Sequence, residues 1–141
     1  MINAHMLTKL PRRLRNNNPL NIRKSNTRWQ GKKVNGDDKD FEQFVSLEYG
    51  IRAAMVNIRT YLKRDRLQNI CQIIAKWAPS SDGNNVDAYI DAVCKKATIT
   101  RAQIIKYNDK NTICRIVWAM AYVECGQEIS FGRVCNAWAL I

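Results

Sequence analysis

The sequence has a single histidine, His5, and its five cysteines include no Cys-x-x-Cys pair, in which two residues separate the cysteines. Zinc sites built from cysteine and histidine need such short spacings, so no metal is expected. A cysteine–histidine catalytic pair would depend on His5, close to a chain terminus, and is not expected either. An odd number of cysteines without a secretory signal favours reduced thiols, mostly buried in helices. No sequence feature calls for a cofactor.

Long hydrophobic runs are also missing. No apolar segment approaches the roughly 20 residues of a membrane span. The N-terminus is basic, but no hydrophobic stretch follows it, so synthesis in the cytoplasm without a signal peptide is expected. Activity outside the cytoplasm would then require another way out of the cell.

Acidic residues are few: 12 Asp and Glu stand against 23 Lys and Arg, which gives a formal charge of +11. This imbalance implies an anionic partner, namely nucleic acid, an acidic membrane face, or a bacterial cell wall that carries carboxylates and phosphates. The 141 residues suffice for one domain with a sizeable core. We expect a basic arm over residues 1–14 and a single domain over residues 15–141.

Asparagine is concentrated in one segment, with four copies in six positions within RNNNPLNIR, residues 15–23. Asparagine side chains compete with the backbone for hydrogen bonds, and Pro19 has no N–H, so an ordered loop is expected. The amides suit a ligand rich in hydroxyl and N-acetyl groups, and Trp29 could stack on a sugar ring. The alternative is a cluster of Asx-turns that only shapes the loop. The candidate substrate-binding residues are Asn16, Asn17, Asn18, Asn21, Arg23, Trp29, Gln30 and Tyr89.

The remaining pattern predicts an α+β fold that is mostly helical. Asn35-Gly36 favours a tight turn, with residues 27–34 and 39–45 as the strands of one small β-hairpin. A helix over residues 47–63, capped by Ser46, would carry a basic face opposite its apolar stripe. Further helices are expected over residues 70–77, 86–96 and 113–123, and a short one after Thr100.

Several segments, in order, resemble phage virion-associated, lysozyme-like, peptidoglycan-degrading proteins, which include muramidases and lytic transglycosylases. The similar segments are RNNNPLNIR, WQG, FEQFVSLEYGIRA (residues 41–53), IIAKWAP (residues 73–79) and residues 85–93. A looser similarity links the chain to flagellar-type glucosaminidases. The resemblance implies a lysozyme-like fold and cleavage of the glycan strands of peptidoglycan.

Such cleavage needs a carboxyl group with a raised pKa to protonate the leaving oxygen. The glucosaminidase pattern puts this Glu just before the asparagine-rich segment, yet residues 1–15 contain no acidic residue. The apolar stretch IVWAMAYVECG, residues 116–126, contains a Glu at the end of a predicted helix. We therefore expect a circularly permuted fold in which Glu124, the general acid, lies beside the asparagine loop. The alternative is a solvated Glu at a frayed helix end.

Two other acids are candidates for the chemistry. Glu48 lies in the first turn of the helix capped by Ser46, where the helix dipole alone explains a negative charge. It is the alternative general acid. Glu42, on the predicted hairpin, is the candidate second carboxylate that would position water or stabilise an oxocarbenium-like state.

Three classes of function follow. A cell-wall lytic glycosidase ranks first, and an inactive peptidoglycan-binding or virion structural protein ranks second. A nucleic-acid-binding module is a distant third, because the Lys and Arg residues are spread along the chain without a recognised motif. The expected place of action is the bacterial cell wall or periplasm, reached from a virion, a lysis system or a secretion machine. Hydrolysis or transglycosylation, the linkage cut and the oligomeric state stay open.

Overall fold

The computed structural model describes residues 11–141, so the predicted basic arm lies outside the described residues except for positions 11–14. Among the described residues the structure is mostly helical, as the sequence predicts. Its elements are α2 (Arg12–Arg15), α3 (Leu47–Lys63), α4 (Ile70–Trp77), the 3₁₀ turn η1 (Ser80–Asp82), α5 (Val86–Ala97), α6 (Lys110–Cys125) and α7 (Phe131–Trp138).

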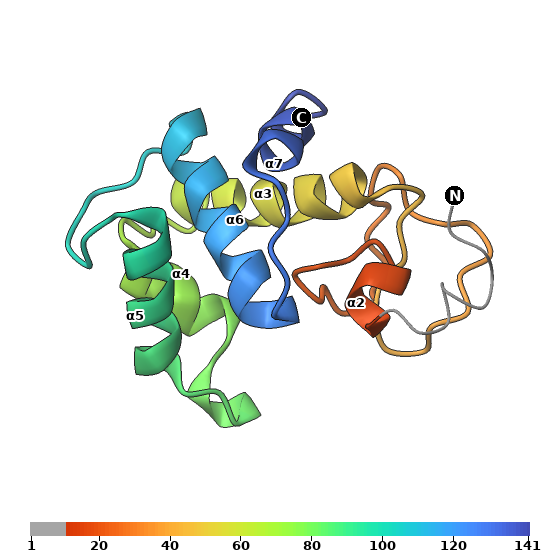
Figure 1. Cartoon of the computed structure of the whole chain (residues 1–141), viewed down its shortest axis with the longest axis horizontal. Helices are drawn as coiled ribbons and strands as arrows, with labels where there is room; N and C mark the ends of the chain where they lie inside the picture. Colours follow the sequence, from red (N-terminus) through yellow and green to blue (C-terminus); the bar gives the residue numbers. More distant parts are fainter. Residues whose placement is uncertain (1–10) are drawn as a thin grey trace.

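Helix α6 forms the centre of the molecule and packs against α5, α7 and α3 (Figure 1). Its apolar residues point in almost every direction, and Ile113, Ile116 and Met120 are fully buried. A helix that is apolar on most of its faces is stable only when other elements surround it. Asp109 begins α6 by accepting a hydrogen bond from the Thr112 N–H, and Gly126, with φ +70°, ends it.

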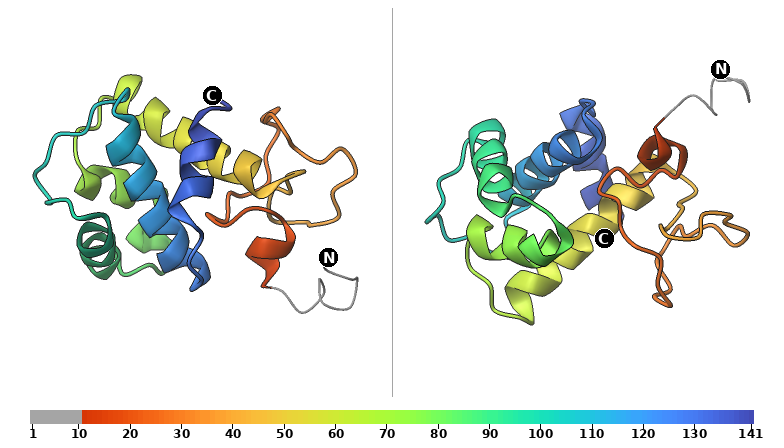
Figure 2. Two further views of the ribbon diagram at one scale, coloured as in Figure 1. Left: turned by 45° about the horizontal axis from the view of Figure 1, so that its top comes forward. Right: turned by 90° about the horizontal axis from the view of Figure 1, so that it is seen from below.

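Helix α3 joins the two sides of the molecule. Residues 12–46 gather on one side, the helices α4 to α6 lie on the other, and α3 runs from the first side into the second (Figure 2). Its bounds and its Ser46 cap are as the sequence predicts. Gly50 lets the loop backbone approach closely, because a Cβ built there would lie 1.8 Å from the carbonyl oxygen of Asn17.

The predicted hairpin is not confirmed. Residues 16–46 form a loop region with two isolated antiparallel bridges, Arg23 with Phe41 and Lys32 with Phe44. Neither Asn35 nor Gly36 has the positive φ that the tight turn requires. Side chains instead take the backbone donors: Gln43 Oε1 accepts from the N–H groups of residues 37 and 38, and Asp38 Oδ1 accepts from those of residues 40 and 41. Backbone pairing of the two predicted strands is therefore limited to the bonds from the Lys33 N–H to the Gln43 carbonyl and from the Val45 N–H to the Gly31 carbonyl.

Two helical expectations also differ from the structure. No helix follows Thr100; the Ile105 N–H donates to the Gln68 carbonyl 2.8 Å away, which ties this segment to the loop before α4. Helix α7 was not predicted. It begins at a Ser130 cap and packs against α3 and α6, with the rings of Phe131 and Trp118 edge to face, 5.7 Å apart.

All five cysteines lie within the described residues and are free thiols. Cys114 is buried and the other four are half-buried, so burial is less complete than the sequence suggested. Burial, with Cys135 beside it, raises the pKa of the Cys114 thiol to about 12. Over residues 11–141, no helix is long and apolar enough to cross a membrane.

Replacing Gly50 with Ala should destabilise the protein, because the added methyl group meets the Asn17 carbonyl. Overpacking of this kind typically costs about 1–3 kcal/mol of unfolding free energy. Gly132→Ala is the matched control: that helical glycine has nothing nearer than 3.9 Å, so Ala should be neutral or stabilising. Urea denaturation of both variants checks this, and equal stability of the two would contradict it.

Candidate active site

A cleft of about 410 Å³ opens between the loop region and the helices. The loop region contributes Asn21, Ile22 and Arg23, and α2 contributes Arg13. The other residues come from the end of α4 with the turn after it, from α3 and from α6; they include Asn57, Tyr61, Trp77, Asp82, Asn84 and Glu124. Segments from both ends of the chain therefore form one site.

Glu124 is half-buried in this cleft, one residue before the end of α6. Its Oε2 accepts a hydrogen bond of 3.3 Å from Trp77 Nε1. Burial raises the pKa of the Glu124 carboxyl, while the Trp77 hydrogen bond and the Arg13 charge act in the opposite direction. Burial has the larger effect, so the protonated form persists to higher pH than it does in a free glutamate.

Two polar side chains, Tyr89 and Arg13, lie near this carboxyl without a hydrogen bond or ion pair to it. Tyr89, on α5, is only 8% exposed, and its hydroxyl has no hydrogen-bond partner among the described residues. Burial, and next the charge of Glu124, raises the pKa of Tyr89, whereas Arg13 lowers it. Glu124, Tyr89 and Arg13 therefore lie within electrostatic reach of one another.

Three of the four loop asparagines use their amides inside the protein. Asn18 is fully buried: its Nδ2 donates to the carbonyls of Ile22 and Glu42, and its Oδ1 accepts from the Ile22 N–H. Asn17 donates to the Phe44 carbonyl, and Asn16 bonds Asp38 and Gln43. These contacts give Asn16, Asn17 and Asn18 a structural use in place of the expected substrate binding, as in the alternative in which the segment only shapes the loop. The partners lie between 4 and 27 residues away, so the contacts are not local Asx-turns.

The expected juxtaposition of the loop and Glu124 is present, although not through Asn18. Asn21, in the left-handed conformation with φ +58°, lines the cleft together with Arg23 and Glu124. Arg23 also lies over the Phe41 ring, with its guanidinium carbon 5.7 Å from the ring centre. Tyr89, another predicted substrate-binding residue, is buried and does not line the cleft, although it lies within electrostatic reach of Glu124.

Trp29 and Gln30 do not line the cleft. Trp29 is half-buried against the hydrophobic core, and its Nε1 has no partner among the described residues. Gln30 is exposed, and Gly31, with φ +76°, packs against Tyr49, whose side chain leaves no room for a Cβ. The WQG segment therefore shapes a turn, and the aromatic side chains of the cleft are Tyr61, Trp77 and Phe41.

The two alternative acids lie elsewhere. Glu48 accepts a hydrogen bond of 2.7 Å from Arg133 Nε and joins α3 to α7. Glu42 is 1% exposed and pairs with Lys32 Nζ at 3.1 Å. Neither lines the cleft that contains Glu124, so the structure does not support Glu42 as a second carboxylate in that cleft. Asp82, in η1, is the second acid that lines the cleft.

The sequence interpretation missed Arg13, Tyr61 and Asp82. Arg13 was assigned to a basic arm, and no pattern distinguished it from its neighbours. Trp77 could have been selected from the IIAKWAP segment, which carries the family resemblance. Among residues 11–141 no group of three or more His, Cys, Asp or Glu side chains could hold a metal ion.

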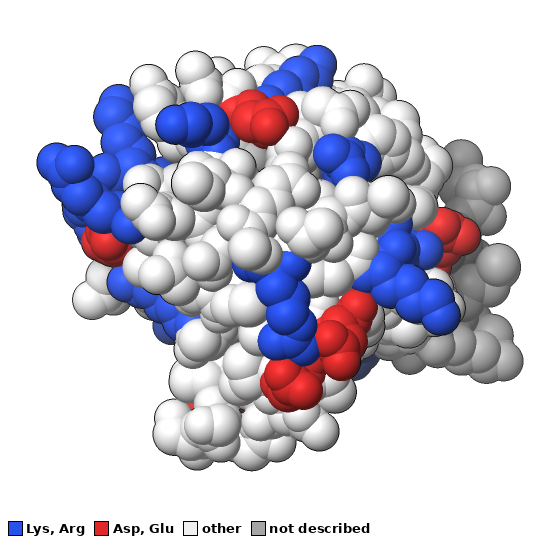
Figure 3. All heavy atoms as spheres, turned by 90° about the vertical axis from the view of Figure 1, so that its left-hand side faces the viewer, with Lys and Arg blue, Asp and Glu red and all other residues white. Residues whose placement is uncertain are grey.

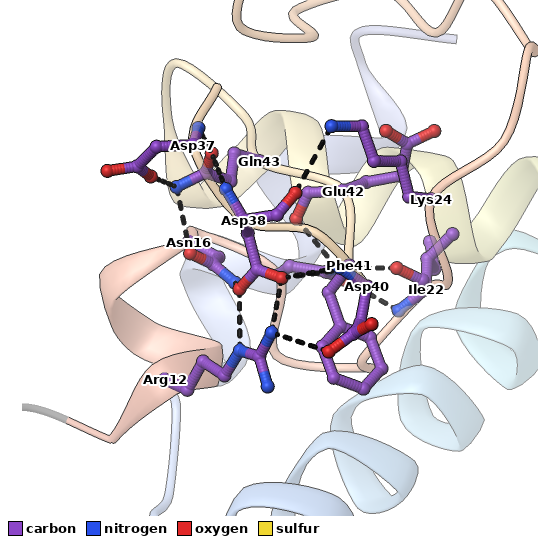
Figure 4. A network of polar contacts seen from close by, with 11 residues as sticks. Arg12, Asn16, Ile22, Lys24, Asp37, Asp38, Asp40, Phe41, Glu42 and Gln43 are labelled. Atoms are coloured by element: carbon purple, nitrogen blue, oxygen red, sulfur yellow. Dashed lines mark hydrogen bonds and ion pairs between the residues drawn. The ribbon is translucent and has the colours of Figure 1, made fainter.

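A polar network holds α2 on the loop region (Figure 4). The Arg12 guanidinium binds both oxygens of Asp38, with Nε 2.6 Å from Oδ2, and it reaches Asp40 Oδ2 at 3.1 Å. Asn16 Nδ2 donates to Asp38 Oδ2 at 2.8 Å. The network fixes Arg12 and so helps to hold the adjacent Arg13 in the cleft.

No family model matches the chain. It is 38% identical over 125 residues to Protein P5 of Pseudoalteromonas phage PM2, covering 86% of this chain and 76% of that protein. At this identity and coverage the chain belongs to a class of phage protein. It is a member of the Protein P5 family.

Acid should weaken the Arg12–Asp38 network. The hydrogen bond from Arg12 holds the pKa of Asp38 well below its ordinary value of 3.8. Because the pKa of Asp38 is lower in the folded state, its ionised carboxylate stabilises the fold fully above pH 3.8, the ordinary value. This stabilisation is lost as the pH falls through the lower pKa of the folded state. We therefore expect Asp38→Asn to lower the melting temperature at pH 7 and to reduce the fall in melting temperature below pH 3.8. Asp40→Asn, at an exposed partner of the same Arg12, should change both much less.

Proposed function

We propose that this chain is a lysozyme-like enzyme that cleaves glycosidic bonds in the glycan strands of peptidoglycan, with Glu124 as general acid. The observation that supports this most directly is the half-buried Glu124 carboxyl, with its raised pKa, in a cleft shared with Asn21. A carboxyl with a raised pKa keeps its proton to higher pH than a free glutamate, and it can then deliver this proton to a leaving oxygen.

The environment of Glu124 suits this role. The Trp77 N–H fixes Oε2, and Oε1 has no hydrogen-bond partner among the described residues, which leaves it for a sugar oxygen. Tyr61 and Trp77, edge to face with ring centres 6.5 Å apart, give the cleft an apolar part. Asn21, Asn57 and Asn84 supply amides that suit hydroxyl and N-acetyl groups.

The order of the elements agrees with a circularly permuted lysozyme-like fold. The Glu-bearing helix α6 follows the asparagine loop by about a hundred residues, yet Asn21 and Glu124 line one cleft. In the glucosaminidase pattern the Glu instead directly precedes the loop. The permutation therefore accounts for the lack of an acid in residues 1–15.

The bond cleavage has two possible outcomes, which give different products. In hydrolysis a water attacks C1 of the sugar, and Asp82 is the available acid to position it. In transglycosylation the C6 hydroxyl of the same sugar attacks C1 and returns its proton to the Glu124 carboxylate. The resulting anhydro sugar is lighter by one water, so mass spectrometry of digested sacculi separates the two reactions.

The anionic partner is the cell wall in this proposal. A hollow of about 530 Å³ along α3 is lined by Arg52, Arg59, Lys63 and Arg64, with no acidic side chain among its lining residues. The guanidinium of Arg59 is held between the rings of Tyr107 and Trp138, 5.5 and 5.1 Å from their centres. We call these four cations the α3 basic groove. Arg64 pairs with Asp65 at 2.9 Å, and the other three would attract the wall at long range.

The face at the left-hand side of Figure 1 gives no support to nucleic-acid binding. There, Lys and Arg stand in separate groups on a mostly uncharged surface, and several lie beside Asp or Glu (Figure 3). Arg101, for example, pairs with both Asp87 and Asp91. The relative from phage PM2 fits a protein that a virion carries to the wall, which is the delivery route we propose.

Replacing Lys63 and Arg59 together with Gln should weaken retention on insoluble peptidoglycan at 0.1 M salt. The difference from wild type should shrink at 1 M salt, where the Debye length falls from about 10 Å to about 3 Å. The control is the double variant Arg28→Gln, Lys95→Gln, which removes the same charge from exposed sites outside the groove. Equal retention of both double variants would show that the groove has no special role.

Glu124→Gln should reduce the clearing of peptidoglycan suspensions by about 10²–10⁴-fold, the usual loss when a general acid is removed. Its melting temperature at pH 7 should stay level or rise, because a buried amide costs less to desolvate than a carboxylate. Wild-type activity should fall as the pH rises through the raised pKa of Glu124, since only the protonated form donates.

Glu48→Gln is the matched control for Glu124→Gln. It makes the same substitution at an acid that pairs with Arg133 outside the cleft, and it should keep most activity. An inactive Glu48 variant beside an active Glu124 variant would reverse the assignment. If the wild type releases no fragment from any sacculus but is retained on it, the inactive wall-binding protein replaces the enzyme.

A further inference from the structure

Arg13 is a cation of the cleft that forms no ion pair with any acid of residues 11–141. Its neighbour Arg12, in contrast, forms ion pairs with Asp38 and Asp40 of the loop region. Arg13 Nε is buried and has no acceptor among the described residues. Helix α2 thus presents the guanidinium of Arg12 paired with acids at one hollow, and the guanidinium of Arg13 without an ion pair to a described acid in the cleft.

The nearest titratable groups of the cleft do not neutralise Arg13. Its charge lowers the pKa values of both Glu124 and Tyr89, so it lies close enough to influence them. When Glu124 is protonated, as a general acid must be, Asp82 is the other acid that lines the cleft, and it forms no ion pair with Arg13. A half-buried cation without an ion-pair partner favours an incoming anion.

We propose that Arg13 is a specificity-determining residue that binds a carboxylate carried by the glycan strand next to Glu124. This inference rests on the proposed function. In peptidoglycan every second sugar carries a lactyl group that ends in a carboxyl or in a peptide, whereas chitin is neutral. The planar guanidinium binds a carboxylate through two parallel hydrogen bonds, which fixes its orientation.

Binding of this carboxylate also affects the proton on Glu124. Arg13 opposes the effect of burial on Glu124, and a carboxylate on Arg13 cancels much of that opposition. The acidic sugar therefore helps Glu124 to keep its proton in the complex. A neutral sugar in the same cleft would not have this effect.

The test measures binding separately from turnover, in a Glu124→Gln background, by calorimetric titration. One probe is the tetrasaccharide of alternating N-acetylglucosamine and N-acetylmuramic acid, with free lactyl carboxylates; the other is chitotetraose. We expect the added Arg13→Gln change to weaken the acidic ligand by about 10-fold or more and chitotetraose by less than about 2-fold. Arg13→Lys keeps the charge but cannot form the two parallel hydrogen bonds, so its affinity for the acidic ligand should lie between those of Arg13 and Arg13→Gln. Arg15→Gln, on the same helical turn but outside the cleft, is the matched control and should change neither.

Equal losses for the two ligands, no preference for the acidic one, or no binding of either ligand in the Glu124→Gln background would overturn the assignment. Melting curves and the Arg13→Lys variant show whether Arg13→Gln acts through folding. The proposed function is tested independently by wild-type release of fragments from sacculi. Fragment release without an acidic preference defeats only the Arg13 assignment, and an acidic preference without release defeats only the enzyme.

Discussion

The packing of the asparagine loop on α3 is the contact on which the rest of the site depends. The Asn17 carbonyl lies so close to Gly50 that no side chain fits between loop and helix. The loop keeps this position because the amides of Asn16, Asn17 and Asn18 bind residues 22, 38, 42, 43 and 44. Since Asn21 follows directly, the same contacts place it in the cleft with Glu124.

The residues that look most like ligand-binding groups in the sequence thus have a structural use. An asparagine amide bonds a backbone carbonyl as readily as a sugar hydroxyl, and composition does not distinguish these uses. Burial decides between them: Asn18 is fully buried, whereas Asn21 is half-buried and faces the cleft. The same holds for Trp29, whose ring packs against the core, and for Trp77, whose N–H reaches Glu124.

Helical periodicity predicted the bounds of α3 closely, because an apolar stripe and a Ser46 cap agree there. Helix α6 was predicted within a few residues at each end, and its Glu124 was correctly expected beside the loop. The hairpin is not confirmed: its two segments share one isolated bridge, and the side chains of Asp38 and Gln43 accept from the backbone N–H groups of residues 37, 38, 40 and 41 in the connection. Arg13 could not be recognised, since its place depends on the contact of Arg12 with a loop 26 residues away.

The cleft also has a consequence for biosynthesis. One of its sides comes from residues 13–23, and the acid comes from position 124, so a growing chain has no complete cleft until most of it has been translated. Contacts over such long separations form slowly compared with local ones, because the intervening chain must be ordered first. In the enzyme we propose, a nascent or truncated chain would lack the acid, and the cell that makes the protein would meet the activity only in finished molecules.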